Sequence, residues 1–322
     1  MIKKIFFYVL LTSILISSYM FEGCNNSNTT SQPNSINPQF DKAGDFSEGL
    51  AAVSLDNKFG YINKKGKMVI KPQFDKAKGF SEGLATVSLG NKFGYINKKG
   101  KMVIEPQIDE TRDFSEGLAA VSINKSFGYI DKTGKVVIEL QFDEARDFSE
   151  GLAAVSLDNK VGYIDKTGKV VIKPQFKETG DFSEGLAAVS LGNKFGYINK
   201  TGEMIIKPQF NFVCPFSEGL AAVSVHNEYG YIDKTGKMII KSTPTFIVPG
   251  PLLSSFSEGL APILQDGKYG YIDKTGKVII ESYFSEVGDF SEELAAVSLD
   301  NKVGYIDKTG EMIIKPLFDA AR

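Results

Sequence analysis

The chain repeats one short passage eight times, and this repetition constrains its fold more than any other feature. Phe-Ser-Glu begins at positions 46, 80, 114, 148, 182, 216, 256 and 290, and Gly-Tyr-Ile begins at 60, 94, 128, 162, 196, 230, 270 and 304. Both series advance by 34 residues, except for one step of 40. Self-similarity at such a period indicates an array in which each copy is one supersecondary unit.

Each copy contains three short runs that favour β-strands, which in the first copy are residues 50–55, 59–62 and 67–70. Asp56 and Asn57 tolerate positive φ and predict a tight hairpin turn between the first two strands. Asn63 and Gly66 favour a type I turn that closes a second hairpin. Pro72 is expected to end the third strand, because proline cannot donate to a β-ladder. Each copy is thus predicted to be a three-stranded antiparallel meander.

A single meander cannot bury enough apolar surface to fold alone, so neighbouring copies must cover one another. The side chains expected to be covered in the first copy are Val53, Leu55, Phe59, Tyr61, Met68 and Ile70. The predicted fold is all-β: a tandem array of eight meanders that forms an open β-solenoid or superhelix. The alternative is an eight-bladed propeller, which the count of three strands per copy disfavours because blades usually have four.

The residue order within a copy resembles the WG repeat, also called the KWG repeat, of bacterial proteins. The resemblance rests on the patterns F-S-E-G-L-A-x-V, G-Y-I-D/N-K-x-G-K and I-x-P-Q-F, and it extends over residues 39–322. The tryptophan that names the family is replaced by Phe59, Phe93, Phe127, Val161, Phe195, Tyr229, Tyr269 and Val303. Most of these residues are aromatic, so we expect the packing role to be kept. The resemblance implies binding or surface roles without an assigned reaction.

The first residues differ from the repeats and are typical of an export signal. Lys3 and Lys4 precede an apolar run over residues 5–16, as in a secretory signal peptide. Cys24 resembles the lipidated cysteine of bacterial lipoproteins, and the alternative is an uncleaved apolar anchor. The predicted divisions are a signal peptide at 1–23, a flexible tether at 24–38 and the repeats at 39–322. Both alternatives place the repeats in the cell envelope, at a membrane surface.

The charge balance and the motifs argue against several classes of ligand. Lys and Arg number 37 and Asp and Glu 39, so the chain lacks the basic excess that nucleic-acid binding uses. The two cysteines, Cys24 and Cys214, differ in context and do not indicate a disulfide framework. The copies also lack the alternating oxygen ligands of a calcium loop and the glycine fingerprint of a nucleotide site. We expect no nucleic-acid partner, no metal and no cofactor.

Two series of acidic residues recur with the repeats. The glutamates are Glu48, Glu82, Glu116, Glu150, Glu184, Glu218, Glu258 and Glu292. The aspartates that precede several of them by three positions are Asp45, Asp113, Asp147, Asp181 and Asp289. These carboxylates would either form a ladder for cations and basic partners or close the turn between repeats by accepting backbone N–H groups. We favour the second interpretation, because a residue that recurs in every copy builds the scaffold.

The tyrosines of the Gly-Tyr-Ile tripeptides form a third series. They are Tyr61, Tyr95, Tyr129, Tyr163, Tyr197, Tyr231, Tyr271 and Tyr305. Recurring rings would bind choline or glycans through their faces, or they would pack in the core with the hydroxyl at its edge. We favour the core, because Phe59 and Tyr61 are two residues apart and therefore point to one face of a strand.

Function is expected where the copies disagree. The segment Lys241–Phe256 supplies the extra residues of the long step, and its apolar members are a candidate partner contact or a local cap of the stack. These members are Phe246, Ile247, Val248, Leu252 and Leu253. In the next strand, Pro262 is expected to perturb the pairing. Cys214 is interpreted as a half-buried structural thiol and His226 as an exposed turn residue.

These observations predict a noncatalytic, membrane-anchored binding or scaffold protein that presents a repetitive surface to another protein. One alternative is a module that binds cell-wall or host glycans through the recurring tyrosines. The other is a hydrolase whose site would include Cys214 or His226.

Overall fold

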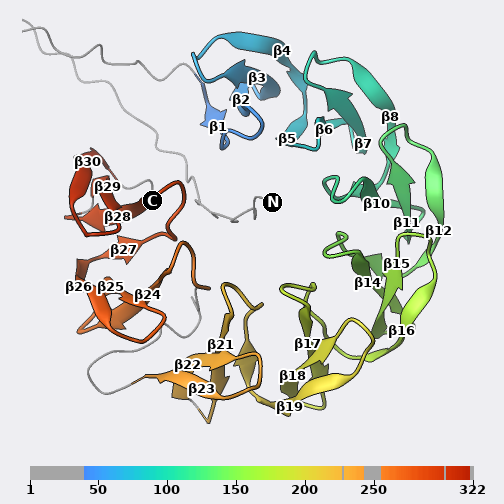
Figure 1. Ribbon diagram of the computed structural model, residues 1–322. Coiled ribbons are helices and arrows are strands. Elements are labelled where there is room, and N and C mark those ends of the chain that lie inside the picture. The colour runs from blue at the N-terminus through green and yellow to red at the C-terminus, as the bar shows by residue number, and fades with distance from the viewer. Residues whose placement is uncertain (1–39, 227, 243–254, 301, 320–322) are drawn as a thin grey trace, which may run out of the picture.

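The computed structural model describes residues 40–226, 228–242, 255–300 and 302–319. Within these ranges every regular element is a β-strand, and the strands form eight separate antiparallel sheets, one for each sequence repeat. We number these repeats 1 to 8 in chain order. The sheets follow one another around a common centre, from repeat 1 in blue to repeat 8 in red (Figure 1). The all-β prediction is confirmed, and neighbouring sheets lie side by side as expected of an array.

Each repeat contributes up to four strands, which we call inner, second, third and outer by their place relative to the common centre (Figure 1). The inner strands are β1 (Lys42–Ala43), β5 (Lys76–Ser81), β9 (Glu110–Thr111), β13 (Glu144–Ala145), β20 (Phe212–Val213) and β27 (Glu286–Val287). The second strands are β2 (Leu50–Leu55), β6 (Leu84–Leu89), β10 (Leu118–Ile123), β14 (Leu152–Leu157), β17 (Leu186–Leu191), β21 (Leu220–Val225), β24 (Leu260–Gln265) and β28 (Leu294–Leu299).

The third strands are β3 (Lys58–Asn63), β7 (Lys92–Asn97), β11 (Ser126–Asp131), β15 (Lys160–Asp165), β18 (Lys194–Asn199), β22 (Glu228–Asp233), β25 (Lys268–Asp273) and β29 (Lys302–Asp307). The outer strands are β4 (Met68–Phe74), β8 (Met102–Ile108), β12 (Val136–Phe142), β16 (Val170–Phe176), β19 (Met204–Phe210), β23 (Met238–Lys241), β26 (Val278–Phe284) and β30 (Met312–Asp319).

The inner strand is a feature that the sequence did not predict. Six of the eight sheets have four strands, in the order inner, second, third and outer, and two have three. The inner strand of repeat 1 pairs Lys42 with Ser54 and Ala43 with Val53. Most inner strands are only two residues long and contain charged residues, so they lack the alternation that identifies longer strands. The prediction of three strands per copy is therefore wrong for most repeats, and four strands is the usual number in a propeller blade.

The outer strand continues through proline, contrary to the prediction that Pro72 ends it. β4 runs from Met68 to Phe74 and is paired on one side only, by β3. An edge strand can accept a proline because its free side needs no donor. A register shift opposite Gly60 also brings the Pro72 nitrogen close, and a Cβ at Gly60 would lie 2.7 Å from it. Glycine is required here because the backbone of the outer strand fills the space of a side chain.

A second proline is also accommodated without disturbance. Pro262 lies in β24 and pairs with Tyr271 in the same register that Ala52 and Tyr61 adopt in repeat 1. The expected perturbation is therefore absent. Within the described residues β24 is an edge of its sheet, so the missing N–H of Pro262 breaks no ladder bond there.

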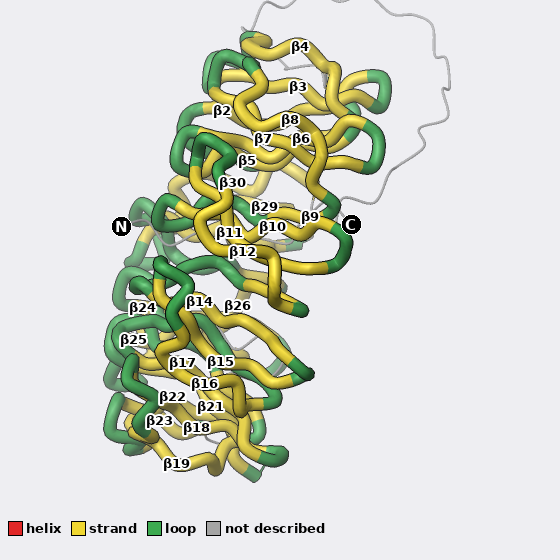
Figure 2. The backbone as a smooth tube through the Cα atoms, turned by 90° about the vertical axis from the view of Figure 1, so that its right-hand side faces the viewer, coloured by secondary structure: helices red, strands yellow, loops and turns green. Residues whose placement is uncertain are grey.

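The predicted turns are present. Asp56 and Asn57 both have positive φ, 51° and 61°, which is the conformation of a two-residue hairpin turn. In the second turn the Gly66 N–H donates to the Asn63 carbonyl at 2.9 Å, and the Lys65 N–H donates to the Asn63 Oδ1 at 3.0 Å. The turns gather along two sides of the array, with the strands running between them (Figure 2).

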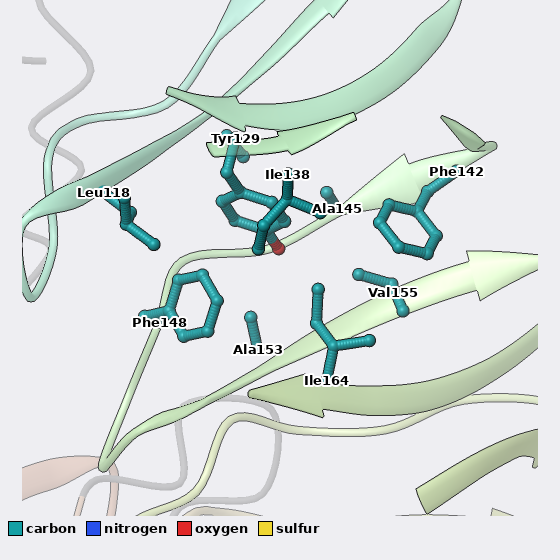
Figure 3. Close-up of a cluster of buried hydrophobic side chains, with 10 residues drawn as sticks. Leu118, Tyr129, Ile138, Phe142, Ala145, Phe148, Ala153, Val155 and Ile164 are labelled. Atoms are coloured by element: carbon teal, nitrogen blue, oxygen red, sulfur yellow. The ribbon is translucent and has the colours of Figure 1, made fainter. Parts of the chain in front are cut away.

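The hydrophobic core lies between repeats, in clusters that we call seams. The seam between repeats 3 and 4 joins Tyr129 and Ile138 of one repeat to Phe148 and Val155 of the next (Figure 3). Equivalent clusters join each successive pair of repeats. This arrangement confirms that the stack forms the core. The prediction that Leu55 is covered is wrong. Leu55 ends its strand beside the turn and is 41% exposed.

The described part of the chain contains no helix that is long and apolar enough to cross a membrane.

Candidate functional site

The recurring tyrosines are buried in the seams. Tyr61 is fully buried, and its ring centroid lies 5.0 Å from that of Phe80 in the next repeat. Its hydroxyl donates to the carbonyl of Lys78 at 2.7 Å, and burial raises the pKa of this hydroxyl. The buried members of the series are Tyr61, Tyr95, Tyr129, Tyr163, Tyr197, Tyr231 and Tyr271. The core interpretation is confirmed for these rings, which are therefore not available to stack on a ligand.

The recurring glutamates also belong to the seams. Glu48 has a φ of 52°, which is strained for a residue with a side chain, and its carboxylate reaches the following repeat. There it accepts the Gly83 N–H at 3.0 Å and lies 3.2 Å from the Lys98 Nζ. The equivalent ion pairs are Glu82–Lys132, Glu116–Lys166, Glu150–Lys200, Glu184–Lys234, Glu218–Lys274 and Glu258–Lys308. The turn-closing interpretation is confirmed for seven glutamates, each of which accepts a backbone N–H of the next repeat. Glu292 makes no such bond to a described residue.

One repeat keeps this turn without its glycine. Glu293 stands where repeat 1 has Gly49, yet its φ is 69°, so the turn still requires the left-handed conformation. Its N–H donates to the Glu258 carboxylate at 3.0 Å, as the glycine N–H does elsewhere. The backbone geometry is therefore retained at a conformational cost that a glycine would avoid.

The acids of the second turn act locally. The Asp131 Oδ1 accepts the N–H groups of Thr133 and Lys135 at 2.9 and 3.1 Å. A hydrogen bond from the Thr133 hydroxyl is the main cause that lowers the pKa of Asp131. Among the described residues there is no group of three or more His, Cys, Asp or Glu that could hold a metal ion.

A different surface varies from repeat to repeat. We define the inner rim as the two residues that precede Phe-Ser-Glu, on or just after the inner strand. Its described pairs are Gly44-Asp45, Lys78-Gly79, Arg112-Asp113, Arg146-Asp147, Gly180-Asp181, Cys214-Pro215 and Gly288-Asp289. The first member of the pair is thus a glycine, a lysine, an arginine or a cysteine. Exchanges of this kind also occur at the start of the inner strand, where Lys42, Glu110 and Phe212 are equivalent.

The backbone of the inner rim is nevertheless fixed. The tyrosine hydroxyl of each preceding repeat donates to the carbonyl of the first rim residue at 2.6–2.7 Å. The described acceptors are Lys78, Arg112, Arg146, Gly180, Cys214 and Gly288. A buried donor thus holds each carbonyl whatever side chain follows it. The rim combines a common backbone with a variable chemical surface.

Three cations stand on consecutive repeats of the rim. The Arg112 Nε donates to the Ala145 carbonyl at 3.0 Å, and the Arg146 Nη1 donates to the Thr179 carbonyl at 3.0 Å. Lys78 makes a longer contact of the same kind, 3.4 Å from its Nζ to the Thr111 carbonyl. Each side chain therefore leans over the next repeat. A guanidinium has five N–H donors, so Arg112 and Arg146 retain donors for a ligand.

Carboxylates alternate with these cations. Asp113 lies 4.0 Å from the Lys78 Nζ. Asp147 is half-buried, and its Oδ1 has no hydrogen-bond partner among the described residues. Burial raises the pKa of Asp147, and the Arg112 guanidinium opposes this effect. The rim of repeats 2 to 4 is therefore a strip of mixed charge, with donors and acceptors at neighbouring positions.

A cavity continues this strip into repeats 5 and 6. It has a volume of about 180 Å³, and its lining includes Arg146, Asp181, Phe195 and Pro215. An arginine and a carboxylate thus line the cavity together with apolar residues. Such a site suits a side chain of a bound polypeptide better than a large cofactor, because ligand pockets for drug-sized molecules are typically larger.

The residues singled out from the sequence are not brought together. Cys24 and the candidate contact Phe246, Ile247, Val248, Leu252 and Leu253 lie outside the described residues. Cys214 is buried, and burial raises the pKa of its thiol to about 12. Its N–H bonds to the Ala222 carbonyl, whereas His226 is an exposed turn residue beyond the end of β21. The turn histidine is confirmed, and the structural thiol is buried where it was expected to be half-buried.

The inner rim was missed from the sequence, although a signal for it was present. The chain has three arginines, and two of them, Arg112 and Arg146, occupy the same position in consecutive repeats. Because all other cations of the chain except Arg322 and the single histidine are lysines, this recurrence indicates a local preference for a guanidinium. The spacing alone did not reveal that this position faces the centre of the array.

Comparisons with known proteins agree with the fold. A family model described as "WG containing repeat" matches residues 34–59, 59–93, 93–125, 127–160, 162–195, 195–229, 229–242, 253–269, 269–302 and 304–322. No curated protein matches the chain. A crystal structure of a eukaryotic initiation factor is similar at 11% identity and a TM-score of 0.57, over 87% of this chain and 88% of that chain.

Two further solved structures are similar at lower scores. Hsv2p from Kluyveromyces lactis has 10% identity and a TM-score of 0.44, over 72% of this chain and 92% of its own. The dihydro-heme d1 dehydrogenase NirN, in complex with DHE, has 14% identity and a TM-score of 0.48, over 84% and 74%. The initiation factor is the one of the three whose score supports a shared fold, which is propeller-like.

Proposed function

Because the chain belongs to the WG-repeat family and its recurring residues hold the seams, we propose that it is a noncatalytic binding protein. Its contact surface is the inner rim, and its partner is another protein. The observation that carries this proposal is the contrast at the rim, where a tyrosine hydroxyl fixes the backbone while the side chain changes from repeat to repeat. Binding surfaces on repeat scaffolds have this division between a constant frame and variable positions.

The charges of the rim support a polypeptide partner. Arg112 and Arg146 retain N–H donors that suit carboxylates and carbonyls, and Asp113 and Asp147 supply acceptors between them. A nucleic-acid backbone would meet these carboxylates as like charges. A polypeptide segment with acidic and amide groups meets both kinds of site.

The two alternatives lose their main support. The glycan hypothesis relied on accessible tyrosine rings, and seven of these rings are buried with at most 1% exposure. The hydrolase hypothesis relied on Cys214 or His226, of which the first is buried and the second lies on an exposed turn. Cys214 and His226 therefore do not form the pair of nucleophile and neighbouring base that a hydrolase would need.

The proposed rim requires a curved array, and we propose a ring-like, propeller-type course in preference to an open superhelix. Two observations support it: the sheets are arranged around one centre (Figure 1), and the inner strand brings most sheets to four strands. Small-angle scattering of the repeat region tests this course, because a disc and an extended superhelix of the same mass differ in radius of gyration.

We also propose that the repeats are held at a membrane surface of the cell envelope through Cys24. The support is the sequence alone: Lys3, Lys4 and the apolar run precede this cysteine. Detergent-phase partitioning of the full chain and of Cys24→Ala tests the anchor. The lipid proposal requires that the substitution moves the protein out of the membrane fraction; equal partitioning would leave an apolar anchor in its place.

Site-specific cross-linking in intact cells tests the binding surface. A photoreactive amino acid is introduced at position 112 or 146 on the rim, and at Lys71 or Lys173 on the outer strands as matched controls. We expect discrete protein adducts from the rim positions, and we expect charge reversal at the other rim arginine to reduce them. Equal adducts from the outer positions would contradict the assignment of the rim as the contact surface.

A further inference from the structure

The first and last repeats each expose apolar side chains whose equivalents are buried in a seam elsewhere. Phe46 is 47% exposed, whereas its equivalents in repeats 2 to 8 are at most 2% exposed. At the other end Tyr305 is 37% exposed and Ile314 is 40% exposed, whereas their equivalents in earlier repeats are at most 1% and 5% exposed. Repeat 1 thus exposes one residue of its half-seam, whereas Ala51, Val53 and Ile62 are buried in a cluster with Phe40. Repeat 8 exposes two residues that are buried at every internal seam.

Polar groups at these two ends also lack the interactions that their equivalents make, among the described residues. Within the described residues, the Glu292 carboxylate has no ion pair or hydrogen bond, although its equivalents bind a lysine and a backbone N–H of the next repeat. Lys64 is the equivalent of these lysines in repeat 1, and it forms no ion pair with any residue that the structure describes. Each end thus carries one half of the same interaction.

We propose that repeat 8 docks on repeat 1 of the same chain through an eighth seam. Tyr305 packs on Phe46 and donates its hydroxyl to the Gly44 carbonyl. The Ser291 hydroxyl donates to the Phe46 carbonyl. The Glu292 carboxylate accepts the Gly49 N–H and pairs with Lys64. Each contact copies one at the seam between repeats 1 and 2, where the Ser47 hydroxyl donates to the Phe80 carbonyl at 2.5 Å.

We infer that the exposed face of repeat 8 is covered by repeat 1 of the same chain, because the curvature of the array brings the two ends towards each other. The inference rests on the ring-like course proposed above. In Figure 1 repeats 1 and 8 stand on either side of one gap in the ring. A second copy that docked its repeat 1 beside repeat 8 would need the place that the ring-like course gives to the first copy's own repeat 1. Tethered ends also meet at a high effective concentration.

Complementary cysteines test the docking in the full chain. Glu292→Cys and Lys64→Cys are combined in a Cys24→Ser background and treated with a short bismaleimide; the buried Cys214 is left in place. The matched control is Glu258→Cys with Lys308→Cys, a pair whose native groups lie 3.0 Å apart. We expect an internally cross-linked monomer of altered gel mobility, in a yield comparable to that of the control.

Two results would overturn the proposal. Cross-linked dimers in place of monomers would identify a second copy as the occupant, and no product from the end pair while the control pair reacts would show that the ends stay apart. Scattering separates the causes: a compact disc without the end cross-link refutes the docking alone, whereas an extended particle refutes the ring-like course as well.

A charge swap provides a second readout without cysteines. Glu292→Lys alone and Lys64→Glu alone place like charges together at the proposed seam, and the double variant restores opposite charges. We expect faster hydrogen exchange in repeats 1 and 8 of each single variant and recovery in the double variant. Additive effects in the double variant would contradict a direct contact.

Discussion

At the scale of single residues, one side chain type explains how the repeats hold together and still vary. The buried tyrosine packs on the next phenylalanine and binds the carbonyl of the first rim residue. For Tyr129 the two contacts are a ring distance of 4.8 Å to Phe148 and a hydrogen bond of 2.7 Å to the Arg146 carbonyl. The hydroxyl therefore joins a core function to the positioning of the rim.

Removal of this hydroxyl is expected to destabilise the protein. Tyr129→Phe leaves the Arg146 carbonyl without its donor, which costs about 1–3 kcal/mol when the group stays buried. Chemical denaturation measures the change in the free energy of unfolding. The control is Tyr283→Phe, because Tyr283 is 42% exposed and we expect its substitution to change the free energy by less than about 0.5 kcal/mol. Equal effects would show that the buried bond contributes little.

A rim carboxylate is expected to give stability an unusual pH dependence. Because burial raises the pKa of Asp147, its charged form is less favourable in the folded than in the unfolded protein. Stability from this group is complete below the unfolded pKa and is lost as pH rises through the folded pKa. Asp147→Asn should therefore raise the melting temperature at pH 7, and this gain should shrink at pH 3.

The result depends on several charges around Asp147. They are Arg112, Asp181, Asp113 and Lys78. A lower melting temperature of Asp147→Asn at pH 7 would mean that attraction to Arg112 outweighs the cost of burial.

At the scale of the elements, the outer strand depends on glycine in the third strand. A Cβ at Gly128 would lie 2.5 Å from the Ile138 carbonyl oxygen, so Gly128→Ala must displace β12. We expect a loss of about 2 kcal/mol or more from such overpacking. Gly180→Ala is the matched control, because its Cβ would make an ordinary contact of 3.6 Å with Ala188. Thermal denaturation of both variants compares them, and a neutral Gly128→Ala would refute the close approach.

The elements also show what could be predicted from the sequence. The second strand and both turns followed from β-favouring residues and from Asp, Asn and Gly, whose preferences are local. The inner strand and the fate of Pro72 could not be predicted in this way, because they depend on which strand lies at an edge. For the same reason the sequence shows that Arg112 and Arg146 share one position of the repeat, but it does not show that this position lies on the inner rim.

At the scale of the whole molecule, the glutamates connect the repeats into one unit whose stability should fall in acid. Burial raises the pKa of Glu82, but bonds from Lys132 and the Gly117 N–H outweigh it and hold the pKa below its ordinary 4.5. Other glutamates with a lowered pKa are Glu150, Glu184 and Glu258. A lowered folded pKa contributes stability above the unfolded pKa that is lost as pH falls through the folded pKa.

The melting temperature should therefore fall as the pH is lowered from about 4.5 towards the folded pKa values. In Glu82→Gln one of these groups is absent, so we expect a lower melting temperature at pH 7 and a smaller further drop in acid. The effect of one site should stay below about 1 kcal/mol, because the ion pair is partly exposed to solvent. An unchanged acid response in this variant would assign the pH dependence to other groups.

The long step between repeats 6 and 7 has a consequence for how such a gene can change. The Ser217 hydroxyl still donates to the Phe256 carbonyl at 2.8 Å, and the Gly259 N–H still bonds to the Glu218 carboxylate at 3.0 Å. The intervening chain is longer, yet these two contacts of the seam are kept. Insertions at the crossing from an outer strand to the next repeat therefore leave the frame intact. New sequence can be acquired there, and whole copies can be duplicated or lost by unequal recombination, without a new core having to evolve.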